Sequence, residues 1–142
     1  MIYFDSAYLV KCYLTDPDSE KVRKLAAKAV VISSSSLCLA EFACAVHRAV
    51  REKSIAARQG AEARQAFLAH VREGVIGLIP VSDKILDALL DHMSTMPSDL
   101  FLRSGDALHL ASARQAGFSE IWTNDRHMLR AASHFGILGR SA

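Results

Sequence analysis

Short apolar segments alternate with helical segments along the whole chain, and this alternation most constrains the fold. Strands are expected at 2–5, 30–33, 75–81 and 120–123, with an edge strand at 136–138. Helices are expected at 7–14, 19–29, about 37–52, about 54–72, from 82 to a stop at 96–98, about 106–115 and about 125–134. Alternating strands and helices favour a parallel sheet with helices on both faces. The pattern predicts an α/β fold, a three-layer α/β/α sandwich with a central parallel sheet of four to five strands, plus a helical hairpin at about 37–72.

The length of 142 residues suits one domain, expected to span 1–142. The longest strongly apolar run, 75–81, is far shorter than the ~20 residues of a membrane span. No basic and then apolar leader precedes the first strand, so we expect a cytoplasmic protein. Three cysteines without CxxC spacing argue against a disulfide framework or a zinc site. The net charge of +2 is too small to indicate a nucleic-acid-binding protein, so any basic surface must be local.

Four carboxylates stand where expected strands end or expected helices begin. Asp5 ends the first strand, and Asp125 follows the fourth. Glu41 and Asp106 lie in the first turns of their helices. Because parallel strands end at one edge of a sheet, these acids are expected to converge there. Each has an ordinary alternative, since Asp5 and Asp125 would serve as helix caps, and acids in first helical turns are favoured by the helix dipole. Their common position is the signal for a site.

Charge repulsion gives the acidic cluster a chemical meaning. Two carboxylates ~4 Å apart repel by about 4 kcal/mol at an effective dielectric constant near 20. A domain is stable by only ~5–15 kcal/mol, so several such pairs call for a compensating cation. Oxygen ligands favour Mg²⁺ or Mn²⁺ over zinc or copper. The sequence therefore predicts a Mg²⁺ (or Mn²⁺) site that activates a water for attack on a phosphodiester.

Polar residues flank three of the acids. Ser6, Ser104, Thr123 and Asn124 are expected to orient the carboxylates or to bind substrate phosphate, with helix capping and turn formation as the alternative. His109, three residues after Asp106, is expected to pack or to support the site, not to bind metal.

Basic residues are clustered locally near the acids. Among them, Arg48 and Arg126 are the candidates for binding substrate phosphate, because each lies close to an acid in the sequence. A solvent-exposed helix surface is the alternative for both.

Four segments carry a family resemblance. YFDSAYLVKCYL, LAEFACAVHR, GDALHLASARQAG and IWTNDRHM resemble the acidic motifs of PIN-domain nucleases. The chain is most similar to the VapC-type toxins of bacterial toxin–antitoxin pairs, from Met1 to about Leu138. The resemblance implies an α/β/α sandwich that cleaves RNA with Mg²⁺ or Mn²⁺. It also implies that Asp5, Glu41, Asp106 and Asp125 are both the metal ligands and the catalytic residues.

The resemblance further implies partners. VapC-type toxins are usually homodimers inhibited by a small VapB-like antitoxin, for which the helical hairpin is the expected contact. We therefore expect a metal-dependent endoribonuclease, the toxin of a VapBC-type pair, acting on an RNA substrate. A non-catalytic PIN-like module that binds RNA or protein is the main alternative. A third is another Mg²⁺ phosphotransfer fold, such as a phosphatase or a receiver domain.

Overall fold

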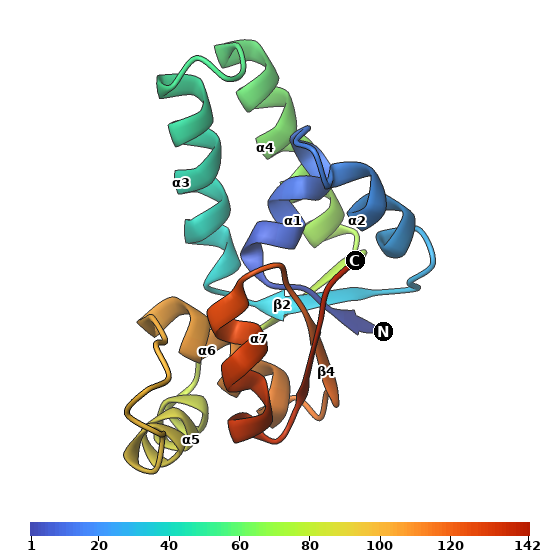
Figure 1. Ribbon diagram of the computed structural model, residues 1–142. Coiled ribbons are helices and arrows are strands. Elements are labelled where there is room, and N and C mark those ends of the chain that lie inside the picture. The colour runs from blue at the N-terminus through green and yellow to red at the C-terminus, as the bar shows by residue number, and fades with distance from the viewer.

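The computed structural model describes residues 1–142, and helices cover both faces of parallel strands (Figure 1). The strands are β1 (Ile2–Tyr3), β2 (Ile32–Ser35), β3 (Ile76–Ile79), β4 (Glu120–Trp122) and β5 (Leu138–Arg140). The α-helices are α1 (Ser6–Tyr13), α2 (Ser19–Ala26), α3 (Cys38–Arg51), α4 (Ala57–Arg72), α5 (Asp83–Ser94), α6 (Ser104–Gln115) and α7 (Arg126–Ala131), followed by the 3₁₀ helix η1 (Ala132–Phe135). None of these helices combines the length and the apolar character needed to cross a bilayer.

The sheet is divided, and this differs from the continuous sheet that the sequence predicted. One part has the parallel order β1-β2-β3 and the other the parallel pair β4-β5. The strands of the two parts are joined by a single bridge between Phe4 and Trp122, at which Asp5 N donates to Trp122 O at 3.2 Å. The chain turns into α1 directly after Asp5, so β1 is too short to pair further with β4.

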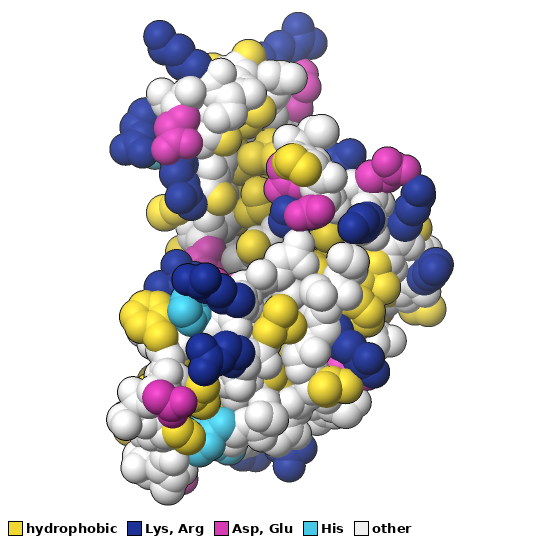
Figure 2. Space-filling view, in the orientation of Figure 1, with side chains coloured by type: hydrophobic (Ala, Val, Ile, Leu, Met, Phe, Trp, Pro, Cys, Tyr) yellow, Lys and Arg dark blue, Asp and Glu magenta, His cyan; other side chains and the backbone are white.

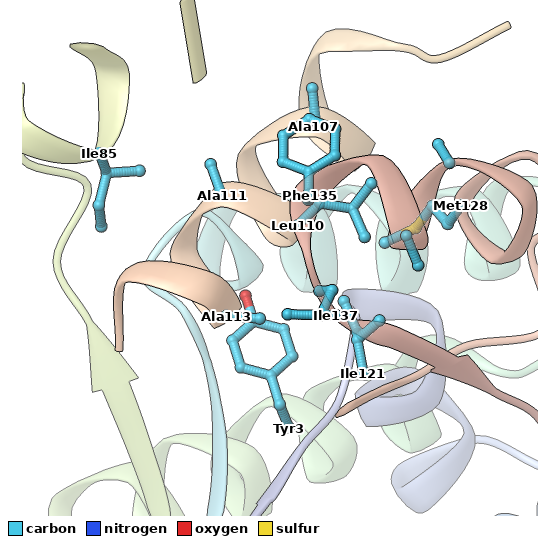
Figure 3. Packing of buried hydrophobic residues seen from close by; sticks show 12 residues of the cluster. Tyr3, Ile85, Ala107, Leu110, Ala111, Ala113, Ile121, Met128, Phe135 and Ile137 are labelled. Carbon is cyan, nitrogen blue, oxygen red and sulfur yellow. The ribbon is translucent and has the colours of Figure 1, made fainter. Parts of the chain in front are cut away.

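Two successive residues, Tyr3 at the end of β1 and Phe4 directly after it, enter two separate hydrophobic cores. Tyr3 packs in a cluster with residues of α5, α6, α7 and η1, shown in Figure 3. Phe4 packs in a second cluster with residues of α1, α2, α3 and α4. Successive side chains of a strand point to opposite faces, so the two clusters are the two sides of the sheet. The predicted three-layer arrangement follows from this division.

Strand β2 lies two residues later than predicted and consists largely of serines. Ser33, Ser34 and Ser35 are buried, and the Ser34 hydroxyl donates to the carbonyl of Phe4 at 2.8 Å. A buried hydroxyl is tolerated when it has a hydrogen-bond partner. The strand predicted to end at Ser33 therefore continues to Ser35, and of the serines only Ser36 lies in a turn.

The predicted helical hairpin is confirmed as α3 and α4, which project together from the rest of the molecule (Figure 1). Phe42 of α3 stacks on Phe67 of α4 with ring centroids 4.0 Å apart. Gly60 allows the close approach, because a Cβ there would lie 2.8 Å from Val50 Cγ2. The buried face of α3 is formed by Cys38, Phe42 and Val46. Leu39, which the apolar pattern placed on that face, is 38% exposed.

Candidate active site

The four acids predicted to converge line one pocket of about 490 Å³. Asp5 comes from the end of β1, Glu41 from the first turn of α3, and Asp106 from the first turn of α6. Asp125 follows β4. The other lining residues are Ser6, Ala7, Val10, Lys11, Asp16, Ala45, Arg48, Arg103, Gly105 and His109. The pocket is open to solvent at the base of the α3–α4 hairpin, where acidic and basic side chains lie next to each other (Figure 2).

Asp5 is both a helix cap and a lining residue of the pocket. Its Oδ1 accepts a hydrogen bond from Tyr8 N at 2.8 Å and so caps α1. Its Oδ2 accepts from the hydroxyl of Thr123. Asp5 is only 4% exposed, and this burial raises the pKa of its carboxyl group. Capping and pocket lining, left open by the sequence, are therefore compatible roles for this side chain.

Asp125 has the same double placement. Its Oδ1 accepts from His127 N at 2.7 Å and from Met128 N at 3.0 Å, which caps α7. Its Oδ2 accepts from Arg103 Nη2 at 2.9 Å. The capping oxygen fixes the side chain, and the other oxygen is directed toward the pocket residue Arg103.

Arg103 joins two of the acids. Its Nε donates to Asp106 Oδ2 at 2.8 Å, in addition to the contact with Asp125. The hydrogen bond with Asp106 raises the pKa of the guanidinium. The sequence placed Arg103 near Asp106 but did not select it as a functional residue. Its three-residue spacing from Asp106 was the available signal, because side chains three apart at the start of a helix can meet.

Glu41 is held by two side chains from other elements. Its Oε2 accepts from the hydroxyl of Ser6 on α1 and lies 2.9 Å from His109 Nε2 on α6. Although burial acts to raise the pKa of Glu41, the hydrogen bonds from His109 and Ser6 outweigh it and lower this pKa. Its Oε1 lies against Gly105, where a Cβ would come within 2.8 Å. The carboxylate is thus anchored through one oxygen and closely flanked at the other.

The remaining predicted site residues divide into two groups. Ser6 and Arg48 line the pocket, and the buried Thr123 contacts Asp5 from behind it. Ser104, Asn124 and Arg126 are exposed and lie outside the pocket lining.

Two further pocket residues were missed as site residues. Lys11 is paired with Asp16 at 2.7 Å on the pocket wall formed by α1 and the segment after it. The spacing of five residues across a helix end gave no clear sequence signal for this pair.

The donors suit a hard divalent cation. The four acids supply only carboxylate oxygens, the ligands that Mg²⁺ and Mn²⁺ prefer. No three His, Cys, Asp or Glu side chains already form an ion cage. Asp106 Oδ2 and Asp125 Oδ2 both accept a hydrogen bond from Arg103. The Arg103 side chain is 62% exposed, so solvent is available to it when it leaves these carboxylates. The residue types therefore fit the metal, with a local rearrangement of Arg103.

Comparison with known proteins places this pocket in a family context. The family model described as PIN domain matches residues 2–133. Ribonuclease VapC46 of Mycobacterium tuberculosis is 32% identical over 138 residues, which are 96% of this chain and 93% of that protein.

Solved structures show the same fold at lower sequence identity. Mycobacterium tuberculosis VapC20, described as a Sarcin-Ricin loop cleaving toxin, has a TM-score of 0.71 at 19% identity, with 92% of this chain and 95% of that one covered. VapBC2 from Rickettsia felis, solved bound to a DNA fragment from its promoter, has a TM-score of 0.70 at 21% identity, with 99% and 98% covered. These likenesses confirm the predicted fold class.

Proposed function

The chain belongs to the PIN domain family, and on this premise we propose that it is a metal-dependent endoribonuclease, the toxin of a VapBC-type toxin–antitoxin pair. The observation that carries the proposal is the convergence of Asp5, Glu41, Asp106 and Asp125 from four distant segments on one pocket. Identity of 32% to Ribonuclease VapC46 across nearly the whole chain supports the same activity. The substrate is RNA, and the bond broken is a phosphodiester.

The four acids are proposed as the metal ligands and catalytic residues. When bound, Mg²⁺ or Mn²⁺ supplies Lewis-acid activation of a water and neutralises charge on the phosphodiester. The chain itself contributes the orientation of the ligands. Tyr8 N and Thr123 fix Asp5, the first turn of α7 fixes Asp125, and Ser6 and His109 fix Glu41. Ligands held in this way need little reorganisation on binding.

Basic and polar residues around the acids are proposed to position the RNA. Arg48 lies on the pocket wall formed by α3, where it can meet a phosphate next to the one being cleaved. Ser104, Asn124 and Arg126 are exposed beside Asp106 and Asp125 and are proposed to contact the RNA outside the pocket. Lys and Arg side chains also lie along the projecting hairpin (Figure 2), which would extend the phosphate-binding surface.

The partners proposed are a small VapB-like antitoxin and a second copy of this chain. The similarity to VapBC2, a toxin–antitoxin complex, supports the antitoxin. The α3–α4 hairpin borders the pocket and is the proposed contact for it. For the homodimer, the support is the apolar stripe of α5, where Leu86, Leu90 and Met93 are exposed. We propose that the protein acts in the cytoplasm, where its three free cysteines stay reduced.

A cleavage assay tests the function. Purified protein is incubated with RNA at increasing Mg²⁺ or Mn²⁺, and the Asp5→Asn and Asp106→Asn variants are compared with wild type. Cleavage is expected to require the metal and to be lost in both variants. Asp87→Asn, an exposed acid of α5 outside the pocket, serves as the matched control and should cleave normally. Undiminished cleavage by Asp5→Asn or Asp106→Asn would contradict the assignment.

A non-catalytic binding module is the second candidate, and Arg103 is the observation that favours it. Two of the acids already hold a guanidinium at hydrogen-bond distance, so the pocket can bind an arginine without a metal. An arginine of a partner protein would be held by the same chemistry. Full RNA binding with no cleavage at any Mg²⁺ or Mn²⁺ concentration would favour this second function.

A further inference from the structure

A chain of buried hydrogen bonds leads from the backbone of β2 to Glu41. Ser35 N donates to the Tyr3 hydroxyl at 3.0 Å. The same hydroxyl lies 3.0 Å from His109 Nδ1. On the other side of the imidazole ring, His109 Nε2 lies 2.9 Å from Glu41 Oε2 and 3.0 Å from Ser6 Oγ. Five elements that are distant in sequence, β1, β2, α1, α3 and α6, are joined by these contacts.

The donors and acceptors in this chain can be assigned from their chemistry. The Ser35 N–H can only donate, so the Tyr3 oxygen accepts from it. The Tyr3 hydroxyl hydrogen is then directed to His109 Nδ1, since the other neighbouring hydroxyl, that of Ser112, makes no hydrogen bond of ordinary geometry. With Nδ1 as the acceptor, the ring hydrogen of the neutral imidazole lies on Nε2, which faces Glu41 Oε2 and Ser6 Oγ. The backbone N–H of β2 thus favours the form of His109 that carries its ring hydrogen on Nε2, the nitrogen that faces the acidic pocket.

Burial makes this assignment rigid. Tyr3 and Ser35 are fully buried, and His109 is 2% exposed. Water therefore does not replace the bond at Nδ1 if the ring turns, whereas Nε2 faces the solvent-open pocket. The edge of the imidazole also packs against Tyr3, with ring centroids 6.1 Å apart and planes at 81°. The Tyr3 hydroxyl points toward α6, the helix that carries His109 (Figure 3).

We propose that Tyr3 and His109 are positioning residues that hold Glu41 in the orientation required of a metal ligand. His109 engages Oε2, and Gly105 leaves just enough room for Oε1. The carboxylate is thereby fixed by one oxygen and keeps the other for a ligand in the pocket. In other metal sites, removing a hydrogen bond that orients a metal ligand typically lowers metal affinity or activity by about 10–100-fold. The inference rests on the proposed function of the pocket.

The chain provides a matched control for Tyr3. Tyr13 on α1 makes the same type of bond, from its hydroxyl to His70 Nδ1 at 2.7 Å. Neither Tyr13 nor His70 lines the acidic pocket. Tyr3→Phe and Tyr13→Phe each remove one hydroxyl from a tyrosine–histidine pair, so a general effect of losing such a bond appears in both variants.

The first test reads the histidine ring directly in metal-free protein. Long-range ¹H–¹⁵N spectra distinguish an imidazole protonated at Nε2 from one protonated at Nδ1. Wild type is expected to show His109 in the Nε2-protonated form. Tyr3→Phe is expected to give a mixture of the two forms at His109, and Tyr13→Phe is expected to leave His109 unchanged. A wild-type His109 protonated at Nδ1 would overturn the inference.

The second test measures Mn²⁺ affinity and RNA cleavage. Tyr3→Phe is expected to weaken Mn²⁺ binding about 10-fold and to lower kcat at fixed Mn²⁺, with KM for RNA unchanged. His109→Gln can still present an amide N–H to Glu41, whereas the shorter side chain of His109→Asn cannot. The Gln variant should therefore bind Mn²⁺ more tightly than the Asn variant, although both replace the buried ring by an amide.

The outcomes separate this inference from the proposed function. A wild-type protein that neither binds Mn²⁺ nor cleaves RNA overturns the proposed function. A wild-type protein that does both, with Tyr3→Phe folded and within twofold of it in Mn²⁺ affinity and kcat, overturns only the inference. Equal losses in Tyr3→Phe and Tyr13→Phe also overturn it, because they would reflect general destabilisation.

Discussion

Arg103 Nη2 donates to Asp125 Oδ2 at 2.9 Å, across 22 positions of sequence. The same guanidinium binds Asp106 through Nε, so one cation neutralises two acids of the pocket. Repulsion among the four carboxylates is therefore relieved in part by the chain itself. The expectation that only a bound ion could make the cluster stable was wrong in this respect. Under the proposed function, a divalent metal would compete with Arg103 for Asp106 and Asp125.

Replacing Arg103 with glutamine is expected to strengthen Mn²⁺ binding several-fold. The metal then no longer has to displace a guanidinium from Asp106 and Asp125. Isothermal titration with Mn²⁺ measures the change. Arg130→Gln, which removes an exposed charge of α7 outside the pocket, is the control for the loss of one positive charge. Weaker binding in Arg103→Gln would show that Arg103 supports the metal and does not compete with it.

Gly105→Ala is expected to separate activity from stability. The new Cβ would lie 2.8 Å from Glu41 Oε1 and push the carboxylate away. The end of a glutamate side chain moves at low cost, and alanine favours a helix over glycine by up to about 1 kcal/mol. The melting temperature should therefore stay equal or rise while Mn²⁺ affinity falls about 10-fold.

Gly77→Ala on β3 is the control for that change. Its Cβ would meet no atom closer than 3.5 Å, so it should leave Mn²⁺ binding unchanged. Wild-type Mn²⁺ affinity in Gly105→Ala would mean that Glu41 is not held where the pocket needs it.

The stability gained by Asp5→Asn in metal-free protein should depend on pH. Burial raises the pKa of Asp5 in the folded state, so folding is penalised once pH rises through that raised pKa. Removing the charge should therefore increase the free energy of unfolding near neutral pH. The gain should disappear below the ordinary aspartate pKa of about 3.9, where the folded and unfolded states are both protonated. Urea unfolding of both proteins with chelator across this range measures it, and a pH-independent difference would contradict it.

Ser112→Ala is expected to be neutral or stabilising by up to about 1 kcal/mol. The Ser112 hydroxyl is fully buried in α6, and its approach to the Tyr3 hydroxyl falls short of ordinary hydrogen-bond geometry, so its removal ends a desolvation penalty. Ser19→Ala is the contrast, because that buried hydroxyl donates to Leu14 O and accepts from Asp16 N. Its loss should destabilise by about 1–3 kcal/mol. Destabilisation of similar size in both variants, by urea unfolding, would show that Ser112 has a partner.

The positions of the acids were predictable because topology alone determines them. Once strands and helices alternate, every strand end lies at one edge of the sheet, and Asp5 and Asp125 need no further information. The hairpin was predictable in the same way from its two long amphipathic segments. These features depend on local pattern and chain direction.

Contacts between side chains far apart in sequence were not predictable. Tyr3 and His109 are 106 positions apart, and their bond depends on how α6 lies across the sheet. The predicted bounds of the serine-rich strand β2 were two residues too early, because the hydrogen-bond partner of Ser34, the Phe4 carbonyl, is known only from the folded protein. The division of the sheet at the Phe4–Trp122 bridge likewise follows from where the cap at Asp5 stops β1.

The acidic pocket lies at this division, because the acids that line it follow strands of both groups. Asp5 and Glu41 follow strands of the group β1-β2-β3, and Asp125 follows β4 of the other group. Asp106 lies on α6, a helix that contacts both β2 and β4.

The strands of the two groups are joined by a single bridge, and side-chain hydrogen bonds from Thr123 to Asp5 and from Tyr8 to Asn124 also cross the division. A cation bound by all four carboxylates would connect the two groups of strands. Loading the pocket would then stiffen the molecule along the line where its two groups of strands are joined by a single bridge.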